Sequence, residues 1–262
     1  MIAVGSVEYA HARIWARHGQ RPAEALWRRI ETTRDLAAVL ELARGSALAC
    51  WLEGIGPAAG SHGIEQALRR HWRERVGEVA TWMPPAWAAA IEWCAVLPDL
   101  PVIQHLARGG APLPWMAVDP GLRALLDARD GADAGDSGQG GPPEARAMRS
   151  LLDAARGGPH DVLPLWRAEW HRRLPPAAAS QGVARPLELL LVEHARAFAA
   201  PQAVDGWALR RQLQSRLVLL LRRTLVEPVT GFVYLALSAL DCERLRGELV
   251  RRAAFPRMGV AP

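Results

Sequence analysis

The residues best suited to metal binding are eight histidines, and their spacing does not form a metal site. His11 and His18 are seven positions apart, which places them on roughly one face of a helix. Neither has a second histidine or a carboxylate three or four residues further along. The chain contains no His-Glu-x-x-His motif and no two Glu-x-x-His segments of the di-iron kind, the patterns by which helices hold zinc or a pair of irons. We therefore expect no metal ligands and interpret the histidines as surface or interface residues.

The serines and glycines form no motif of covalent catalysis or cofactor binding either. No Gly-x-Ser-x-Gly turn is present. The glycine-dense stretch, Asp130–Pro143, follows no strand, whereas a phosphate-binding loop would. The chain has no lysine, so no Schiff-base lysine and no phosphate-loop lysine can exist. We expect a protein without catalytic residues or a cofactor, not an enzyme, with an enzyme whose site the sequence does not group as an open alternative.

The most distinctive charged feature is the arginine-rich C-terminal third. All 32 basic residues are arginine, and residues 206–257 hold ten of them against four acids. Such a surface suits an acidic protein, a membrane surface or nucleic acid, and it is also typical of solvated helix faces. Nucleic acid is less favoured, because no helix-turn-helix, zinc module or aromatic stacking platform accompanies the arginines. The residues expected to bind a partner are Arg210, Arg211, Arg222, Arg223, Arg244 and Arg246.

The elements that would position these residues are helices almost throughout, because apolar residues recur at spacings of three and four. Helices are predicted over residues 36–50, capped by Thr32 or Thr33, and over residues 61–83, capped by Ser61. Others follow Pro84 and Pro85, cover residues 100–108, and cover residues 205–225 with Asp205 as the cap. A last helix follows Pro228. No convincing alternation of apolar and polar residues indicates a strand, so the predicted class is all-α.

A short internal repeat predicts the domain organisation. Ala67-Leu-Arg-Arg70 recurs as Ala208-Leu-Arg-Arg211, 141 positions later, and each begins a helix that ends near proline. We therefore predict two related helical units, residues 1–117 and 144–262, joined by residues 118–143. Asp130–Pro143 has the composition of a flexible linker.

Several features favour a soluble, cytoplasmic protein that is at most peripheral to a membrane. The first nine residues lack the pattern of a signal peptide. The longest aliphatic run, Leu217–Leu221, is far shorter than the roughly 20 residues of a membrane span. Cys50, Cys94 and Cys242 lie in apolar helical stretches and are expected to be buried reduced thiols. The eleven tryptophans are expected to lie in the core.

Two kinds of motif resemble the central-stalk family of V-type and archaeal-type ATPases, whose members are named d in eukaryotes and C in archaea. Tyr9-Ala-His-Ala-Arg13-Ile-Trp-Ala-Arg17 resembles the family's opening Tyr-x-Asn-Ala-Arg-Val-Arg-like helix, with His11 in place of the asparagine. Asp99 with Ile103, and Asp241 with Leu245, resemble the acid and aliphatic residues that end the family's repeated units. The stretch from Phe232 through Tyr234 to Arg246 resembles its penultimate helix.

The resemblance implies a non-catalytic socket that rests on the membrane rotor ring, grips the shaft and transmits torque in a proton- or ion-translocating ATPase. Family members contain three helical bundles, whereas two units are visible here, with residues 144–175 as at most a truncated third. Val102 and Arg244 stand where the family has asparagine. The competing interpretation is an unrelated helical adaptor whose basic face binds acidic protein or nucleic acid.

Overall fold

The computed structural model describes residues 4–133, 143–157, 161–200 and 205–255, and its elements within these ranges are all helices. The predicted all-α class is confirmed. The chain forms two compact units, one made of Met1–Ile91 with Pro175–Pro262 and the other of Glu92–Leu174. This division differs from the predicted boundaries at residues 117 and 143, because segments from both ends of the chain share one core.

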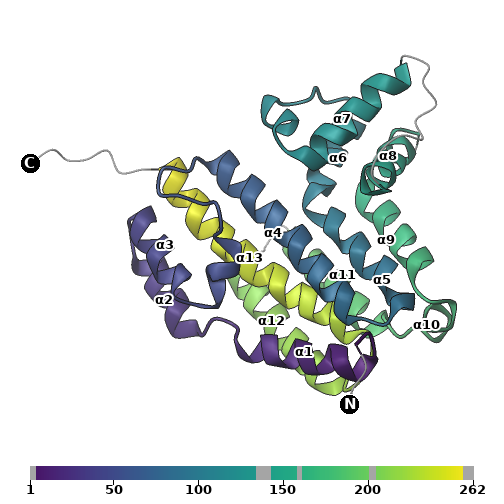
Figure 1. Ribbon diagram of the computed structural model, residues 1–262, viewed down its shortest axis with the longest axis horizontal. Coiled ribbons are helices and arrows are strands. Elements are labelled where there is room, and N and C mark those ends of the chain that lie inside the picture. The colour runs from purple at the N-terminus through teal and green to yellow at the C-terminus, as the bar shows by residue number, and fades with distance from the viewer. Residues whose placement is uncertain (1–3, 134–142, 158–160, 201–204, 256–262) are drawn as a thin grey trace, which may run out of the picture. The chain divides into compact units, whose positions relative to one another are not determined.

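The first unit is built around its last helix. It contains α1 (Val7–Gly19), α2 (Glu24–Thr32), α3 (Leu36–Arg44), the 3₁₀ helix η1 (Ala47–Trp51), α4 (Ser61–Trp82), α5 (Pro85–Glu92), α10 (Pro176–Gln181), α11 (Arg185–Ala199), α12 (Gly206–Arg223) and α13 (Thr230–Ala254). Helix α13 packs against α4, α12, α1 and α3, and Figure 1 shows it running beside α4 through the middle of these helices. Fourteen of its 25 residues are buried, so most of its circumference faces protein.

The second unit is a smaller helical cluster stabilised by stacked tryptophans. It contains η2 (Trp93–Asp99), α6 (Leu100–Ala107), η3 (Pro114–Ala117), α7 (Pro120–Asp133), α8 (Pro143–Arg156) and α9 (Val162–Arg173). The rings of Trp93 and Trp166 are nearly parallel, at 8°, and each indole N–H donates to the backbone carbonyl of the other residue, at 3.0 and 3.2 Å. The Arg173 guanidinium lies 4.5 Å from the Trp93 ring centroid. Residues 144–174 thus complete this unit together with residues 92–133.

Several helix ends differ from the sequence predictions. Asp205 caps α12 as predicted, accepting from the amides of Trp207 and Ala208 at 2.9 and 3.0 Å. Thr32 and Thr33 do not cap α3. Their hydroxyls donate to the Arg29 carbonyl at the end of α2, three and four residues back, and Asp35 caps α3 instead. Ser61 is the first residue of α4, whose N-cap Gly60 makes no side-chain bond.

The two stretches proposed as copies of one repeat differ in helix pattern. After α4, the apolar stretch is broken at η2, which contains Pro98, whereas α13 continues without a break for 25 residues. Proline interrupts an α-helix because it lacks the amide hydrogen and clashes with the preceding turn. The first stretch also crosses from one compact unit into the other, while the second lies within the first unit. The duplication therefore stays a prediction.

The described residues of the predicted linker are helical, and the predicted burial of the cysteines is confirmed only in part. Asp130–Asp133 belongs to α7 and Pro143 begins α8, while residues 134–142 lie outside the described residues. Cys94 and Cys242 are buried as predicted, and burial raises the pKa of the Cys94 thiol to about 12. Cys50 is exposed, because α3 ends at Arg44 and the tighter turn of η1 changes which way the later residues face.

The tryptophans mostly pack inside as predicted. Seven of the eleven are buried, namely Trp27, Trp51, Trp72, Trp82, Trp87, Trp93 and Trp170, while Trp207 is 36% exposed. One apolar stretch, Pro85–Ala107, has the length and composition of a membrane span, with a mean hydropathy of 1.4 over its window, of which 56% is buried. A core helix of a soluble protein meets the same criteria.

Two leucines of α12 provide a test of the core. Leu217 is fully buried and Leu219, two residues on, is 47% exposed. We expect Leu217→Ala to lower the free energy of unfolding by about 3 kcal/mol, because a buried cavity remains. We expect Leu219→Ala to change it by about 0.5 kcal/mol or less. Urea denaturation followed by circular dichroism measures both, and equal losses would contradict the packing of α12.

Candidate functional site

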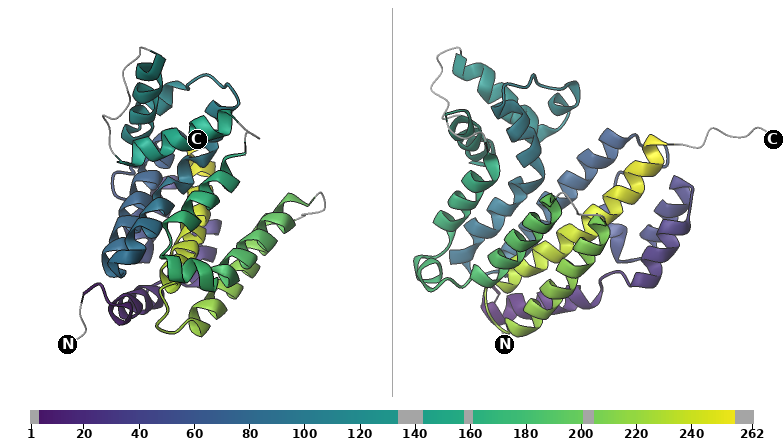
Figure 2. Two further views of the ribbon diagram at one scale, coloured as in Figure 1. Left: turned by 90° about the vertical axis from the view of Figure 1, so that its right-hand side faces the viewer. Right: turned by 180° about the vertical axis from the view of Figure 1, so that it is seen from behind.

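The predicted partner-binding arginines of α12 fall into two groups. Those at its start are already engaged: the Arg210 guanidinium lies 4.7 Å from the ring centroid of Phe198 and 4.8 Å from that of Trp207. Arg211 lies 3.5 Å from the carboxylate of Asp205. Figure 2 shows α11 and α12 side by side in both views, which brings Phe198 of α11 close to the start of α12. Arg210 therefore contacts α11, whereas Arg211 pairs with the N-cap of its own helix.

Arg222 and Arg223, in the last turn of α12, are exposed and form no ion pair with an acidic side chain of the described residues. They begin the segment that we call the basic turn, residues 222–226. Leu225 and Val226 there are 59% and 47% exposed. Val226 has φ of 56°, a left-handed conformation that is strained for a β-branched residue, and its amide donates to Nδ1 of His11 at 3.3 Å. The basic turn thus presents charge and apolar surface together on a fixed backbone.

Arg244, predicted to bind a partner, is buried and ion-paired, whereas Arg246 is ion-paired and 43% exposed. Arg244 is buried and donates to both oxygens of Glu24 at 2.9 Å and to Glu31 at 2.7 Å. Its guanidinium also lies 4.7 Å from the ring centroid of Trp27. Arg246 donates to Glu65 at 2.6 Å. The charge count could not anticipate this, because the acids that neutralise these arginines come from distant helices.

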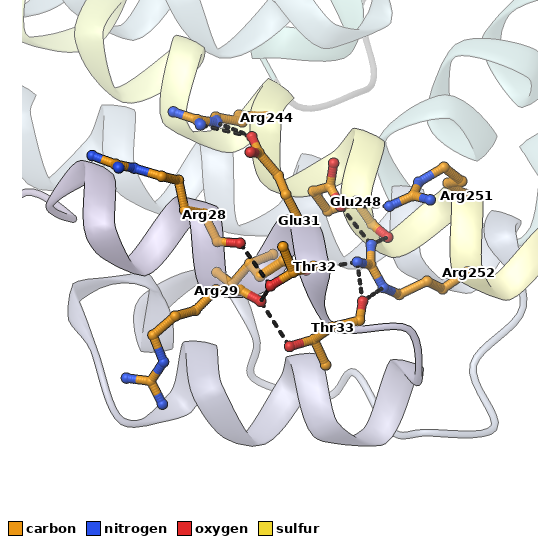
Figure 3. A network of polar contacts seen from close by, with 10 residues as sticks. Arg28, Arg29, Glu31, Thr32, Thr33, Arg244, Glu248, Arg251 and Arg252 are labelled. Atoms are coloured by element: carbon orange, nitrogen blue, oxygen red, sulfur yellow. Dashed lines mark hydrogen bonds and ion pairs between the residues drawn. The ribbon is translucent and has the colours of Figure 1, made fainter.

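A third arginine of α13 completes the attachment of α2, which Figure 3 shows in close-up. Arg252 donates to the carbonyls of Ile30 and Thr33, at the end of α2, and to Glu248 within α13 at 2.6 Å. Carbonyls at a helix end have no partner within the helix, and a cationic donor satisfies them well. We call this set of bonds from Arg244 and Arg252 to α2 the α2–α13 clamp.

The structure brings three of the eight family-motif positions together. Arg17, Tyr234 and Asp241 line one cavity of the first unit, with a volume of about 230 Å³. The others lie elsewhere: Tyr9 and Arg13 are on α1, Leu245 is fully buried on α13, and Asp99 and Ile103 are buried in the second unit. Arg13 lies 5.3 Å from the ring centroid of Trp82.

The cavity lies between the end of α1, η1, α4 and α13, and its ionic groups are closely coupled. Arg21 donates twice to the carboxylate of Asp241, both at 2.7 Å. Glu78 accepts from Arg17 with one oxygen at 2.7 Å and from Arg75 with the other at 2.6 Å. Two guanidiniums therefore share one carboxylate.

Burial dominates the titration of the groups in the cavity wall. It raises the pKa of the Asp241 carboxyl, against the opposing effect of Arg21. It also raises the pKa of the Tyr234 hydroxyl, although Arg75 lowers it in part. Tyr234 therefore remains protonated, and a hydrogen-bond donor, at neutral pH.

Sequence reasoning missed Arg21, Arg75, Glu78 and the hydroxyl of Ser238. They come from separate segments of the chain, and only the spacing of three between Arg75 and Glu78 was visible as a helical ion pair. Nothing in the sequence showed that Arg17 approaches Glu78 from another helix. No group of three or more metal-ligating side chains occurs within the described part of the chain.

The contribution of the α2–α13 clamp to stability can be tested with two adjacent arginines. Arg252 has a side chain that is 4% exposed, and that of Arg251 is 58% exposed, yet both pair with Glu248. We expect Arg252→Met to lower the free energy of unfolding by about 3 kcal/mol, because the carbonyls of Ile30 and Thr33 lose this donor and Glu248 loses one of its two arginine partners. Arg251→Met should cost about 0.5 kcal/mol or less. Chemical denaturation of both variants measures this, and similar losses would show that the clamp is not needed.

His18 makes the stability of the first unit sensitive to pH. Burial, with the nearby charges of Arg21 and Arg222, lowers the pKa of His18 below its ordinary value of 6.5. The unfolded chain therefore binds more protons than the folded chain as pH falls below about 6.5. The contribution of His18 to the free energy of unfolding consequently decreases toward acid pH. We expect the free energy of unfolding of wild type to fall more steeply from pH 7 to pH 5 than that of His18→Gln. Parallel curves would contradict the assignment.

Comparison with known proteins gives no relative for this arrangement. No family model matches the chain, and neither a curated protein nor a solved structure matches it. The resemblance to the V-type ATPase central-stalk family therefore stays a prediction from its short motifs, and the function has to be argued from the geometry described above.

Proposed function

We propose that this protein is a non-catalytic helical subunit that binds an acidic surface of a partner protein through the basic turn. The observation that carries the proposal is the pair Arg222 and Arg223, exposed and without an acidic partner among the described residues, directly beside exposed Leu225 and Val226. Two arginines in the last turn of a helix also interact favourably with its dipole. The dipole does not account for the two apolar side chains beside them, whereas a docking surface does.

The geometry favours an acidic protein over nucleic acid and over a membrane. Four of the six arginines expected to bind a partner are engaged within the chain, as described above. Nucleic-acid affinity depends on several free cations that each release counterions from a phosphate, and of the six only Arg222 and Arg223 have neither an ion pair nor a ring contact among the described residues. An interfacial membrane helix presents a continuous apolar face, and the basic turn presents two apolar residues. Protein interfaces combine a small apolar centre with a charged rim.

Within this class we propose the central-stalk role in a V-type ATPase, with the rotor ring and the shaft as partners. Its support is the sequence resemblance around Tyr9–Arg17 and along α13. In that role the protein acts in the cytoplasm, is at most peripheral to the membrane, and uses no cofactor. The second candidate is an unrelated helical adaptor with the same basic turn.

The chain offers a matched control for the test. Arg28 and Arg29 form another adjacent and exposed pair, on α2. Arg222→Glu/Arg223→Glu and Arg28→Glu/Arg29→Glu change the net charge by the same amount at different surfaces. We expect the first double variant to bind the co-purifying partner about tenfold more weakly at low salt and with less salt dependence, because the charges face an acidic surface. The α2 variant should bind like wild type.

The measurement is affinity purification from the native organism, followed by binding of the purified partner to each variant at low and moderate salt. Rotor-ring and shaft subunits in the purified complex would support the central-stalk role, and their absence with another acidic protein bound would support the adaptor. Equal affinities of both double variants would contradict the proposal. So would a preference of wild type for vesicles containing anionic lipid, or for DNA, that Arg222→Glu/Arg223→Glu abolishes.

A further inference from the structure

We propose that the 230 Å³ cavity of the first unit binds a small oxyanion, either a phosphate or a short dicarboxylate. Its wall brings together side chains from α1, η1, α4 and α13, all within one compact unit. The proposal concerns a separate surface from the basic turn and does not depend on the proposed function.

The first observation is an excess of positive charge. Arg17, Arg21 and Arg75 line the cavity, and the carboxylates that pair with them are Glu78 and Asp241. Since Arg17 and Arg75 share Glu78, three guanidiniums face two carboxylates, and one positive charge is left over. A guanidinium is a planar donor whose geometry matches carboxylate and phosphate oxygens.

The second observation is a set of hydroxyl donors beside these arginines. Tyr234 and Ser238, which are 4% and 7% exposed, line the same cavity, and Ser238 lies within hydrogen-bonding reach of the Tyr234 hydroxyl. Both hydroxyls can donate to an anionic oxygen. The electrostatic influence of Arg17 and Arg75 reaches Tyr234, so the donors and the excess charge act on the same region.

The size of the cavity limits the class of ligand. With a volume of about 230 Å³, the cavity is smaller than the roughly 300–1,000 Å³ pockets that bind drug-sized ligands, so it suits a small ligand. Inorganic phosphate and succinate fit this volume, whereas a nucleotide does not. The indole of Trp51 and the aliphatic residues of η1 form the apolar part of the wall, which suits the short carbon chain of a dicarboxylate.

Three variants test whether the excess positive charge binds the anion, and we expect them to weaken, leave unchanged or tighten the binding. Arg17 and Arg216 have side chains that are 41% and 43% exposed, and each pairs with one glutamate at 2.7 or 2.6 Å. We expect Arg17→Met to weaken the binding of succinate or phosphate about tenfold, and Arg216→Met, outside the cavity, to leave it unchanged. Glu78→Gln should tighten binding, because it frees both guanidiniums from the shared carboxylate.

Isothermal titration calorimetry with inorganic phosphate and with succinate, each against chloride at equal ionic strength, measures these affinities. Cys50 gives a second readout at the site itself, because it is exposed and lines the cavity, while Cys94 and Cys242 are buried. Bound succinate should slow the alkylation of Cys50 by neutral N-ethylmaleimide severalfold in wild type, and much less in Arg17→Met.

The proposal would be overturned if the wild-type protein bound neither phosphate nor succinate. Equal affinities of wild type, Arg17→Met and Glu78→Gln would also overturn it, since the excess charge would then play no part. Binding that survives in Arg222→Glu/Arg223→Glu is expected, because the basic turn does not line the cavity. This last result separates the cavity from the proposed docking surface.

Discussion

The structure of the first unit depends on the burial of arginine side chains on α13. Arg244 and Arg252 lie on a helix that faces protein on most sides, so their charges must be neutralised inside the fold. A buried charge without a partner is very unfavourable, and this requirement determines where α2 lies. Arg244 is neutralised by the carboxylates of Glu24 and Glu31, and Arg252 donates to the carbonyls at the end of α2. The same helix presents Asp241 to Arg21 at the end of α1, so opposite charges attach two N-terminal helices to one C-terminal helix.

Because the chain has no lysine, the cations of this network are all arginines. An arginine has five N–H donors in a fixed plane, so Arg244 can bond two carboxylates at once and still lie over the ring of Trp27. Arg252 uses the same geometry to reach two carbonyls and Glu248. A lysine ammonium at either position would reach fewer of these acceptors. The arginine-rich composition is therefore compatible with burial in a way that a lysine-rich chain would not be.

The helices were largely predictable from the sequence, because their apolar spacing is a local property. The apolar stripe of α4 and the Asp205 cap of α12 are examples in which neighbouring residues alone determine the outcome. The predicted caps at Ser61, Thr32 and Thr33 were wrong. Each has a side chain that can cap a helix, but the side chain alone does not determine at which residue the helix begins. Two units were predicted but not which segments form each of them, since this depends on contacts of α13 with helices some 200 residues earlier.

Less of the candidate sites than of the fold could be predicted, because their residues meet partners that are distant in the sequence. The charge count located a basic region but could not separate Arg222 and Arg223, which stay exposed, from Arg244 and Arg246, whose partners Glu24 and Glu65 lie far away in sequence. Arg17, Tyr234 and Asp241 were singled out by resemblance alone, and only the fold shows that they line one cavity. The roles of Arg75 and Glu78 there depend on the approach of α1 to α4, which no local pattern encodes.

The division of the chain also has a consequence for its synthesis on the ribosome. The second unit is one continuous segment and can assemble as soon as it leaves the exit tunnel. Helices α1 to α4 emerge much earlier than α13, and until it appears their apolar faces and the acids of α2 have no permanent partner. During that interval the nascent N-terminal helices expose apolar surface, and such intermediates are prone to aggregation. Completion of the first unit therefore waits for the synthesis of α13, and translation speed through the middle of the chain sets how long the exposed intermediate persists.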